Sequence, residues 1–365
     1  MSTKSGRTGP KAEDYLRHLV EVAGSDLHLK AGGPAYVRVD GELTAVDTLP
    51  PLTPADTEVF ARQLMPADRW ERFQGGVEAD FAYALPDGTR FRAAAFSQLG
   101  RVGLVLRRVE SGGPSFDDLG LPALVRKLAE AHRGLVLVTG PTGSGKTTTT
   151  AAMIGHINAT RRCHIVTIED PIEIIHGDNL ALVDQREIGA DTGSFASALR
   201  SAARQDPDVI FVGEMRDLET TAAALQAAAT GHLVVSTLHT TSAKDTVTRI
   251  IDLFPPYQQA QARLSLAGSL QGIVCQRLVP RAGGGRVAAL EVMVVTSRIQ
   301  ELLLDPAQTG DIVDAIAGGD YYGMQTFDQH LLQLHADGLV TLKDAMDHAT
   351  SPHDLRIAVR ASGAG

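Results

Sequence analysis

The chain has 365 residues, of which 44% are hydrophobic, so it is long enough to bury two domain-sized cores. Its 34 Lys and Arg residues against 43 Asp and Glu residues give a formal net charge of −9, which excludes the overall basic surface typical of nucleic-acid binding. Its two cysteines, Cys163 and Cys275, are too few for a disulfide framework or a four-cysteine zinc site, and they fit buried free thiols in a reducing cytoplasm.

The amino-terminal third of the sequence predicts a small α+β domain over residues 12–110, preceded by a polar, disordered leader over 1–11. The pattern indicates a short helix at 15–22, strands around 26–30 and 35–46, a helical stretch after Thr53, and further strands. Asp40-Gly41 and Asp87-Gly88 lie between alternating runs, as type I′ hairpin turns favour. No run of about 18 uninterrupted apolar residues occurs, so we expect no direct membrane insertion.

The remainder of the chain predicts a second domain of the α/β class. Ser111-Gly-Gly-Pro-Ser115 combines flexibility with a break in hydrogen bonding, so we place an interdomain linker at 111–120. Strands without inside–outside alternation, separated by helices, indicate a sheet covered on both faces. The expected strands are 134–139, 164–168, 208–212 and 232–238, and the expected helices are 146–158, 195–204, 218–229 and 243–253. This core ends near 297, a loop at 283–285 separates two strands, and 298–365 is mostly helical.

A G-x-x-x-x-G-K-T phosphate loop is the strongest functional signal. It follows the apolar run 134–139 and precedes a predicted helix, as a loop that binds phosphate with its backbone N–H groups requires. Lys146 would contact the β- and γ-phosphates of ATP, and the Thr147 hydroxyl would bind Mg²⁺. The predicted nucleotide-binding residues of the loop are Gly140, Pro141, Thr142, Gly143, Ser144, Gly145, Lys146, Thr147 and Thr148.

Carboxylates at two other strand ends provide candidates for catalysis. Glu169, Asp170 and Glu173 follow one buried strand, and Glu214 follows the next. Ligands of open α/β sheets bind at the carboxyl ends of the strands, so these acids would face the γ-phosphate and its metal. Hydrolysis needs one carboxylate to activate water and another to hold Mg²⁺ or its waters. The alternative is that these acids cap the helices that follow them.

Two histidines, His232 and His239, flank the last buried strand of the predicted core. His239, at the carboxyl end of that strand, would point toward the phosphates and could sense the γ-phosphate. Metal ligation is the rival hypothesis, but no nearby cysteine or carboxylate completes a zinc set at the usual spacing. A polar residue satisfied at a strand end is the simpler structural alternative for either histidine.

Four segments in order resemble the secretion ATPase superfamily of type II secretion and type IV pili, and the resemblance covers nearly the whole chain. They are GPTGSGKT, TIEDPIE, RQDPDVIFVGEMRD and TGHLVVSTLHT. The short length, the missing tetracysteine zinc motif and the segment 322–329 are most similar to the PilT-like pilus retraction ATPases. The resemblance implies a PAS-like N-terminal domain, a RecA-like ATPase core, and a homohexameric ring that drives pilus disassembly with ATP and Mg²⁺.

The resemblance also implies roles for individual residues. Glu173 matches the general base, and Glu214 matches the Walker B glutamate that supports Mg²⁺ and its water. His232 and His239 match the family's His box, the first as a nucleotide-binding and the second as a catalytic residue. Arg92 and Arg107, with Arg101 as a weaker match, would reach the phosphate in a neighbouring subunit; a solvated strand face is the alternative for them. The implied partner is the cytoplasmic face of an inner-membrane platform protein.

One segment departs from the retraction branch. The family's A-I-R-N-L-like stretch aligns with Arg298-Ile-Gln-Glu-Leu302, where Gln300 replaces the arginine and Glu301 the asparagine. Arg204-Gln-Asp-Pro-Asp208 also looks more like the assembly and secretion branches. The alternatives are therefore an assembly or secretion ATPase of the same superfamily and, from different classes, a nucleic-acid motor or a non-catalytic adaptor subunit.

Overall fold

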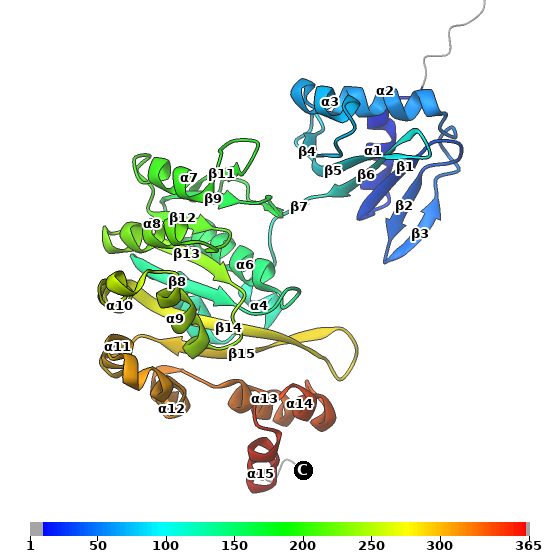
Figure 1. The fold of residues 1–365 in the computed structure, drawn as a ribbon. Coiled ribbons are helices and arrows are strands. Elements are labelled where there is room, and N and C mark those ends of the chain that lie inside the picture. Colours follow the sequence, from blue (N-terminus) through cyan, green and yellow to red (C-terminus); the bar gives the residue numbers. More distant parts are fainter. Residues whose placement is uncertain (1–9, 363–365) are drawn as a thin grey trace, which may run out of the picture. The chain divides into compact units, whose positions relative to one another are not determined.

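The computed structural model describes residues 10–362, so residues 1–9 of the predicted leader lie outside the described part of the chain. The chain divides into two compact units, Met1–Glu110 and Ser111–Gly365 (Figure 1). Within residues 10–362, no helix combines the length and the apolar character needed to cross a bilayer.

The first unit is an antiparallel sheet with helices packed on it. Its helices are α1 (Ala12–Glu21), α2 (Pro54–Leu64) and α3 (Ala67–Gln74). Its strands are β1 (Asp26–Lys30), β2 (Tyr36–Val39), β3 (Glu42–Ala45), β4 (Ala79–Ala84), β5 (Arg90–Gln98) and β6 (Arg101–Arg108). They form one sheet in the order β3-β2-β1-β6-β5-β4. Helix α2 packs on β6 and α1 on β1, and the apolar side chains between them form a separate core.

Both predicted hairpins of this unit exist, but one turn type is wrong. Asp40 and Gly41 join β2 to β3 with φ values of 49° and 87°, the two positive angles that a type I′ turn requires. Between β4 and β5 only Gly88 has a positive φ, at 90°, and its N–H donates to the Leu85 carbonyl over 2.9 Å. Because the ring of Pro86 fixes a negative φ, this hairpin uses a type I turn closed by a left-handed glycine.

The second unit contains the remaining strands and helices. Strand β7 (Glu110–Ser111) lies at the unit boundary. The other strands are β8 (Gly134–Thr139), β9 (His164–Glu169), β10 (Ile174–Ile175), β11 (Leu182–Glu187), β12 (Val209–Val212), β13 (Leu233–Leu238), β14 (Leu270–Pro280) and β15 (Arg286–Val294). The helices before β15 are α4 (Phe116–Leu119), α5 (Ala123–Ala129), α6 (Lys146–Thr160), α7 (Phe195–Ala202), α8 (Leu218–Ala229), α9 (Ala243–Asp252) and α10 (Pro256–Ser269).

The sheet of the second unit is mixed and mostly parallel, in the order β11-β9-β12-β13-β8-β14-β15. All pairs are parallel except β14 with β15. Every residue of β8, β12 and β13 is buried, as expected for strands covered on both faces. Helix α6 packs with α4 and α5, whereas α8 packs with α7 and α10, which gives the two covering layers. The α/β prediction for this unit is confirmed.

The chain beyond β15 is helical, and Figure 1 shows it in orange and red past that strand. It comprises α11 (Ser297–Leu304), η1 (Pro306–Asp311), α12 (Ile312–Ala317), η2 (Asp320–Tyr322), α13 (Phe327–Ala336), α14 (Leu342–His348) and α15 (Pro352–Ser362). Arg277 of β14 holds this part to the sheet. Its guanidinium carbon lies 3.9 Å from the centre of the Phe327 ring, and its Nη1 donates to the His348 carbonyl over 2.9 Å.

The segment predicted as a linker, 111–120, contains ordered structure. Gly112 donates its backbone N–H to the Ile175 carbonyl over 2.8 Å. Helix α4 begins at Phe116, because Ser115 and Asp118 form a reciprocal capping box. The burial of Phe116 then connects this helix to the core of the second unit. The loop predicted at 283–285 is confirmed, since it joins β14 to β15.

Candidate active site

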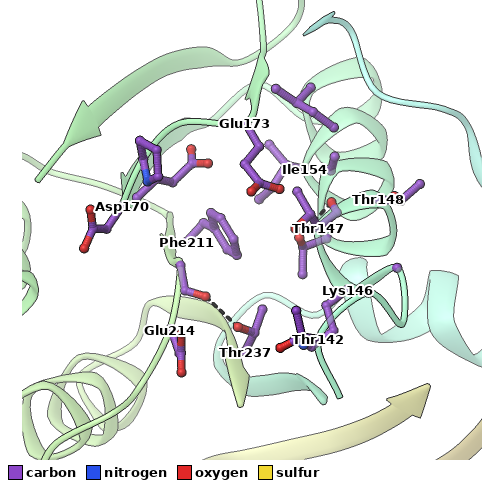
Figure 2. A pocket seen from close by; sticks show the side chains of 18 of the residues that line it. Thr142, Lys146, Thr147, Thr148, Ile154, Asp170, Glu173, Phe211, Glu214 and Thr237 are labelled. Carbon is purple, nitrogen blue, oxygen red and sulfur yellow. Dashed lines mark hydrogen bonds between the residues drawn. The ribbon is translucent and has the colours of Figure 1, made fainter. Parts of the chain in front are cut away.

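A cavity of about 570 Å³ lies at the carboxyl edge of the parallel strands. Side chains from four strand ends meet there, because parallel strands direct their carboxyl ends to one edge. The phosphate loop follows β8, Glu173 follows β9, Glu214 follows β12 and His239 follows β13, and all of these line the cavity. Figure 2 shows Lys146, Glu173 and Glu214 around one space.

The phosphate loop has a backbone shape that favours glycine at three points. Gly140, Gly143 and Gly145 have φ values of 150°, 79° and 88°. A Cβ on Gly145 would lie 2.7 Å from Gln276 Nε2, and one on Gly140 would collide with the Gln276 carbonyl. Helix α6 starts directly after Gly145, which provides no side-chain cap. Its first N–H groups and its dipole therefore make an anion site at the cavity, and this fits a triphosphate.

Lys146 bends its side chain back onto the loop. Its Nζ donates to the Gly140 carbonyl over 2.8 Å and to the Pro141 carbonyl over 3.0 Å. Burial lowers the pKa of Lys146, while the negative charges of Glu214 and Glu173 act in the opposite direction. The ammonium group is therefore close enough to both carboxylates to interact with them, and a phosphate oxygen could replace its carbonyl acceptors.

Both oxygens of Glu214 are engaged. Its Oε2 lies 2.7 Å from Arg216 Nε, and its Oε1 lies 3.1 Å from His239 Nε2. The turn before it is held by Thr237, whose hydroxyl donates to the Gly213 carbonyl over 2.6 Å (Figure 2). This arrangement fixes the orientation of the Glu214 carboxylate and brings His239, on the next strand end, into the same group.

Glu173 stands on a loop that a buried carboxylate organises. Glu169 accepts a hydrogen bond from the Thr167 hydroxyl over 2.7 Å, and burial raises its pKa. Gln185 of β11 donates to Glu169 over 3.2 Å and to the Ile174 carbonyl over 2.9 Å. These bonds hold the chain on both sides of Glu173, whose carboxylate points into the cavity toward α6 in Figure 2.

The alternative that these acids cap helices is wrong. Strand β10, not a helix, follows Glu169, Asp170 and Glu173. Helix α8 does follow Glu214, but its N-cap is Asp217, whose carboxylate accepts the Thr220 N–H over 2.8 Å. The capping role is filled by a different residue, so the four acids do not serve as helix caps.

The oxygen donors of the cavity suit Mg²⁺. Mg²⁺ prefers oxygen ligands and is usually held by one or two carboxylates together with substrate phosphates and water. Thr147 and Glu214 both line the cavity and present such oxygens. Over residues 10–362, no group of three or more His, Cys, Asp or Glu side chains is arranged to hold a metal ion by itself.

Most of the loop residues predicted from the sequence line the cavity, together with Glu173, Glu214 and His239. The loop residues on its wall are Thr142, Gly143, Gly145, Lys146, Thr147 and Thr148. Gly140, Pro141 and Ser144 complete the loop without lining that wall. Ser144 is buried, and within the described residues its Oγ has no hydrogen-bond partner.

His232 lies apart from the other predicted residues of the site. It precedes β13, whereas His239 follows β13, so a six-residue strand separates it from the cavity. Its Nδ1 lies 3.0 Å from the Ala227 carbonyl and 3.3 Å from the Thr230 hydroxyl, at the end of α8. His232 is thus a polar residue satisfied at the amino end of the strand and does not line the cavity, and its role toward the nucleotide stays a prediction.

Arg92 and Arg107 belong to the first unit. They are directly opposite each other on β5 and β6. Arg107 Nε donates to Asp26 Oδ1 over 2.7 Å. Burial raises the pKa of Asp26, but hydrogen bonds from Arg107 and Ser25 outweigh it, and the net pKa is lowered. The role of these arginines, and of Arg101 at the start of β6, toward a neighbouring subunit stays a prediction.

Several residues of the site were missed by the sequence analysis. Arg216 and Arg286 both line the cavity, and Arg216 pairs with Glu214. His176 also lines it, and burial lowers the pKa of His176 to about 4. Arg216, two residues after a candidate acid, could have been noticed from its spacing. Arg286 and Gln276 carry no such signal, because they approach the loop from strands more than 120 residues further along the chain.

The glycine-rich loop lies between a buried parallel strand and a helix, and carboxylates from neighbouring strand ends face it. These features define a P-loop nucleotide triphosphatase of the α/β class. Residues 89–293 match the family model of the type II/IV secretion system protein. The chain is 45% identical over 342 residues to the type IV pilus retraction ATPase PilT of Pseudomonas aeruginosa, a match that covers 94% of this chain and 99% of that protein. It is 42% identical over 349 residues to the type IV pilus ATPase PilU of the same organism, with 95% and 91% covered.

Solved structures agree with these sequence relationships. The crystal structure of the pilus retraction motor PilT with bound ADP has a TM-score of 0.86 and 45% identity, covering 96% of this chain and 100% of that chain. The Legionella pneumophila ATPase DotB has a TM-score of 0.73 and 25% identity, with 97% and 98% covered. The chain therefore belongs to the type II/IV secretion system protein family, as a PilT-like ATPase homologous to the pilus retraction ATPase. The resemblance drawn from the four motifs is confirmed.

Proposed function

We propose that this protein is a homohexameric, Mg-ATP-hydrolysing motor that retracts type IV pili by acting on the inner-membrane platform protein. The observation that carries the proposal is the convergence of Lys146, Glu173 and Glu214 on one cavity in a chain that matches PilT over nearly its whole length. The likeness to the crystal structure of the pilus retraction motor PilT with bound ADP supports both the nucleotide and the output.

The loop amides and Lys146 would bind the triphosphate of ATP, with Thr147 and Glu214 directed at Mg²⁺ or its waters. The metal, when bound, would neutralise charge on the β- and γ-phosphates. Because Glu214 is already paired with Arg216 and His239, it is better suited to orienting than to accepting a proton. Glu173 would take the proton from the attacking water. His239 would report the presence of the γ-phosphate through its contact with Glu214.

The N-terminal unit would act as a PAS-like domain and the second unit as a RecA-like core with a helical extension. In the proposed ring, Arg92 and Arg107 would reach the phosphate bound by the neighbouring subunit and neutralise its developing charge. Nucleotide-dependent closure would then move the partner, because each state makes different contacts with it. The ring would work in the cytoplasm, peripheral to the inner membrane through the platform protein, and would not bind nucleic acid.

Two residues of α11, Gln300 and Glu301, differ from the motif of the retraction ATPases. They favour pilus assembly or protein secretion as the second candidate function. Gln300 does not present a charge at the position of the family's arginine; its Nε2 donates to the Ala267 carbonyl of α10 over 3.2 Å. Glu301 is exposed and lies 3.4 Å from Arg298. The surface that the resemblance links to retraction therefore differs in charge, while the residues of the ATP cavity are retained.

Pilus length and twitching in a deletion strain test the output. Retraction predicts long, abundant pili and loss of twitching, and complementation by Glu173→Gln should fail while Glu130→Gln, an exposed acid outside the cavity, should restore motility. Loss of pili on deletion would instead support the assembly alternative. Unchanged pili and unchanged twitching would contradict retraction and assembly alike and would favour the secretion output.

A further inference from the structure

A buried glutamine on β14 supports the phosphate loop from behind. Gln276 is 3% exposed. Its Nε2 donates to the Ser144 carbonyl over 2.7 Å, and its Oε1 accepts the Thr149 hydroxyl over 2.7 Å. One side chain thus hydrogen-bonds both to the loop itself and to the first turns of α6. A buried amide is costly to bury unless both of its ends are paired, and here both are paired within the loop–helix motif.

The register of the sheet places this amide at the point where the loop begins. Cys275 is opposite Thr139, the last residue of β8, so Gln276 lies level with Gly140. The fit is close: a Cβ on Gly145 would lie 2.7 Å from Gln276 Nε2, and a Cβ on Gly140 would meet the Gln276 carbonyl. Two of the three loop glycines with positive φ, Gly140 and Gly145, are therefore packed against the same residue of β14.

We propose that Gln276 is a positioning residue for ATP, which holds the phosphate loop and the start of α6 in the one shape that binds the triphosphate. The proposal rests on the proposed binding of ATP phosphates by this loop. Gln276 would act through Ser144, Thr149 and the loop amides and would not touch the reacting atoms. Because it shapes the ground-state binding site, its loss should weaken nucleotide binding more than it slows the chemical step.

The test compares Gln276→Met with the wild-type protein. Methionine has a similar length but cannot make either hydrogen bond, and it leaves the Ser144 carbonyl and the Thr149 hydroxyl unpaired. We expect the Kd for ATP with Mg²⁺ to rise by about tenfold or more, while single-turnover hydrolysis at saturating ATP stays within about threefold. Gln276→Glu should also weaken binding, because a carboxylate cannot donate to the Ser144 carbonyl.

Milder variants keep the test meaningful if Gln276→Met folds poorly. Thr149→Val removes one hydrogen bond with little change of shape and should raise the Kd by a few-fold, whereas Thr149→Ser keeps the hydroxyl and should bind as the wild type does. Gln325→Met is the matched control, because Gln325 Nε2 donates to the Leu290 carbonyl over 3.2 Å away from the loop. Its thermal stability should fall without a change in the Kd.

Three results would overturn the inference. One is a Kd of Gln276→Met within about twofold of the wild-type value, and another is a normal Kd with a lost hydrolysis rate. The third is an equal effect of Gln325→Met on the Kd. Failure of the wild-type protein itself to bind ATP would be a different result, because it would contradict the proposed function before any variant is compared.

Discussion

Replacing Glu173 by glutamine separates binding from chemistry in this site. Glutamine keeps the size and one carbonyl acceptor of the side chain but cannot accept a proton from water. The loop around position 173 should keep its shape, because Glu169 and Gln185 hold it through hydrogen bonds that the substitution does not touch. The expected change is therefore chemical and local.

The structure sets the sign and the size of the effects. Loss of a general base lowers turnover by about 10²- to 10⁴-fold, which corresponds to roughly 2.7 to 5.4 kcal/mol of barrier. Two opposing changes act on binding: Lys146 loses a favourable carboxylate neighbour, while the triphosphate loses an unfavourable one. We expect these to offset each other, so that the Kd for ATP changes by less than about threefold.

The assay measures ATP binding at equilibrium and phosphate release in a single turnover, side by side for Glu173→Gln, Glu214→Gln and Glu130→Gln. Glu130, half-exposed and paired with His156, controls for the loss of one carboxylate outside the cavity. Glu173→Gln should bind ATP and fail to release phosphate. Turnover of Glu173→Gln close to the wild-type rate would refute its role as base. If Glu214→Gln alone stops the chemistry, the roles of base and metal support are reversed.

Two further predictions concern Lys146 and His330. Lys146→Ala should abolish turnover by removing a charge that stabilises the transition state, and normal steady-state hydrolysis would remove the assignment of the phosphate loop. Burial lowers the pKa of His330 to about 4, and its Nδ1 accepts the Leu290 N–H over 2.9 Å. In the unfolded chain His330 takes up its proton below about pH 6.5, whereas in the folded protein it does so only near pH 4. The free energy of unfolding should therefore fall as the pH drops from about 6.5 toward about 4, and the loss should be roughly 2 kcal/mol at about pH 5. His330→Gln should show a smaller fall in Tm between about pH 7 and about pH 5, and an equal fall would contradict this origin.

The sequence predicted the parts of the fold that local pattern determines. Continuous apolar runs correctly predicted the strands β8, β9, β12 and β13, because strands that are covered on both faces need apolar side chains at every position. The edge strand β11 escaped prediction, since its sequence, Leu182–Glu187, is largely polar and only partly buried. The turn at Asp87-Gly88 was assigned the wrong type because the preceding proline, and not the Asp-Gly pair, determines its conformation.

Local sequence pattern also determined which residues of the site could be predicted. Lys146, Glu173, Glu214 and His239 were found because each follows a recognisable strand, and parallel strands bring such positions to one edge. The side chains that hold these residues in place could not be predicted from the sequence. The contact of Gln276 with Ser144 joins residues 132 positions apart and depends on the pairing of β14 with β8. His232 shows the converse, since it shares a motif with His239 but lies at the other end of the strand.

The most direct test of the account is a crystal structure of Glu173→Gln with ATP and Mg²⁺ bound. We expect Lys146 Nζ to leave the Gly140 and Pro141 carbonyls and contact the terminal phosphate, with positions 173 and 214 both facing that phosphate. A nucleotide bound elsewhere, or a triphosphate in the loop with either position turned away from it, would contradict the assignment of this cavity as the site of hydrolysis.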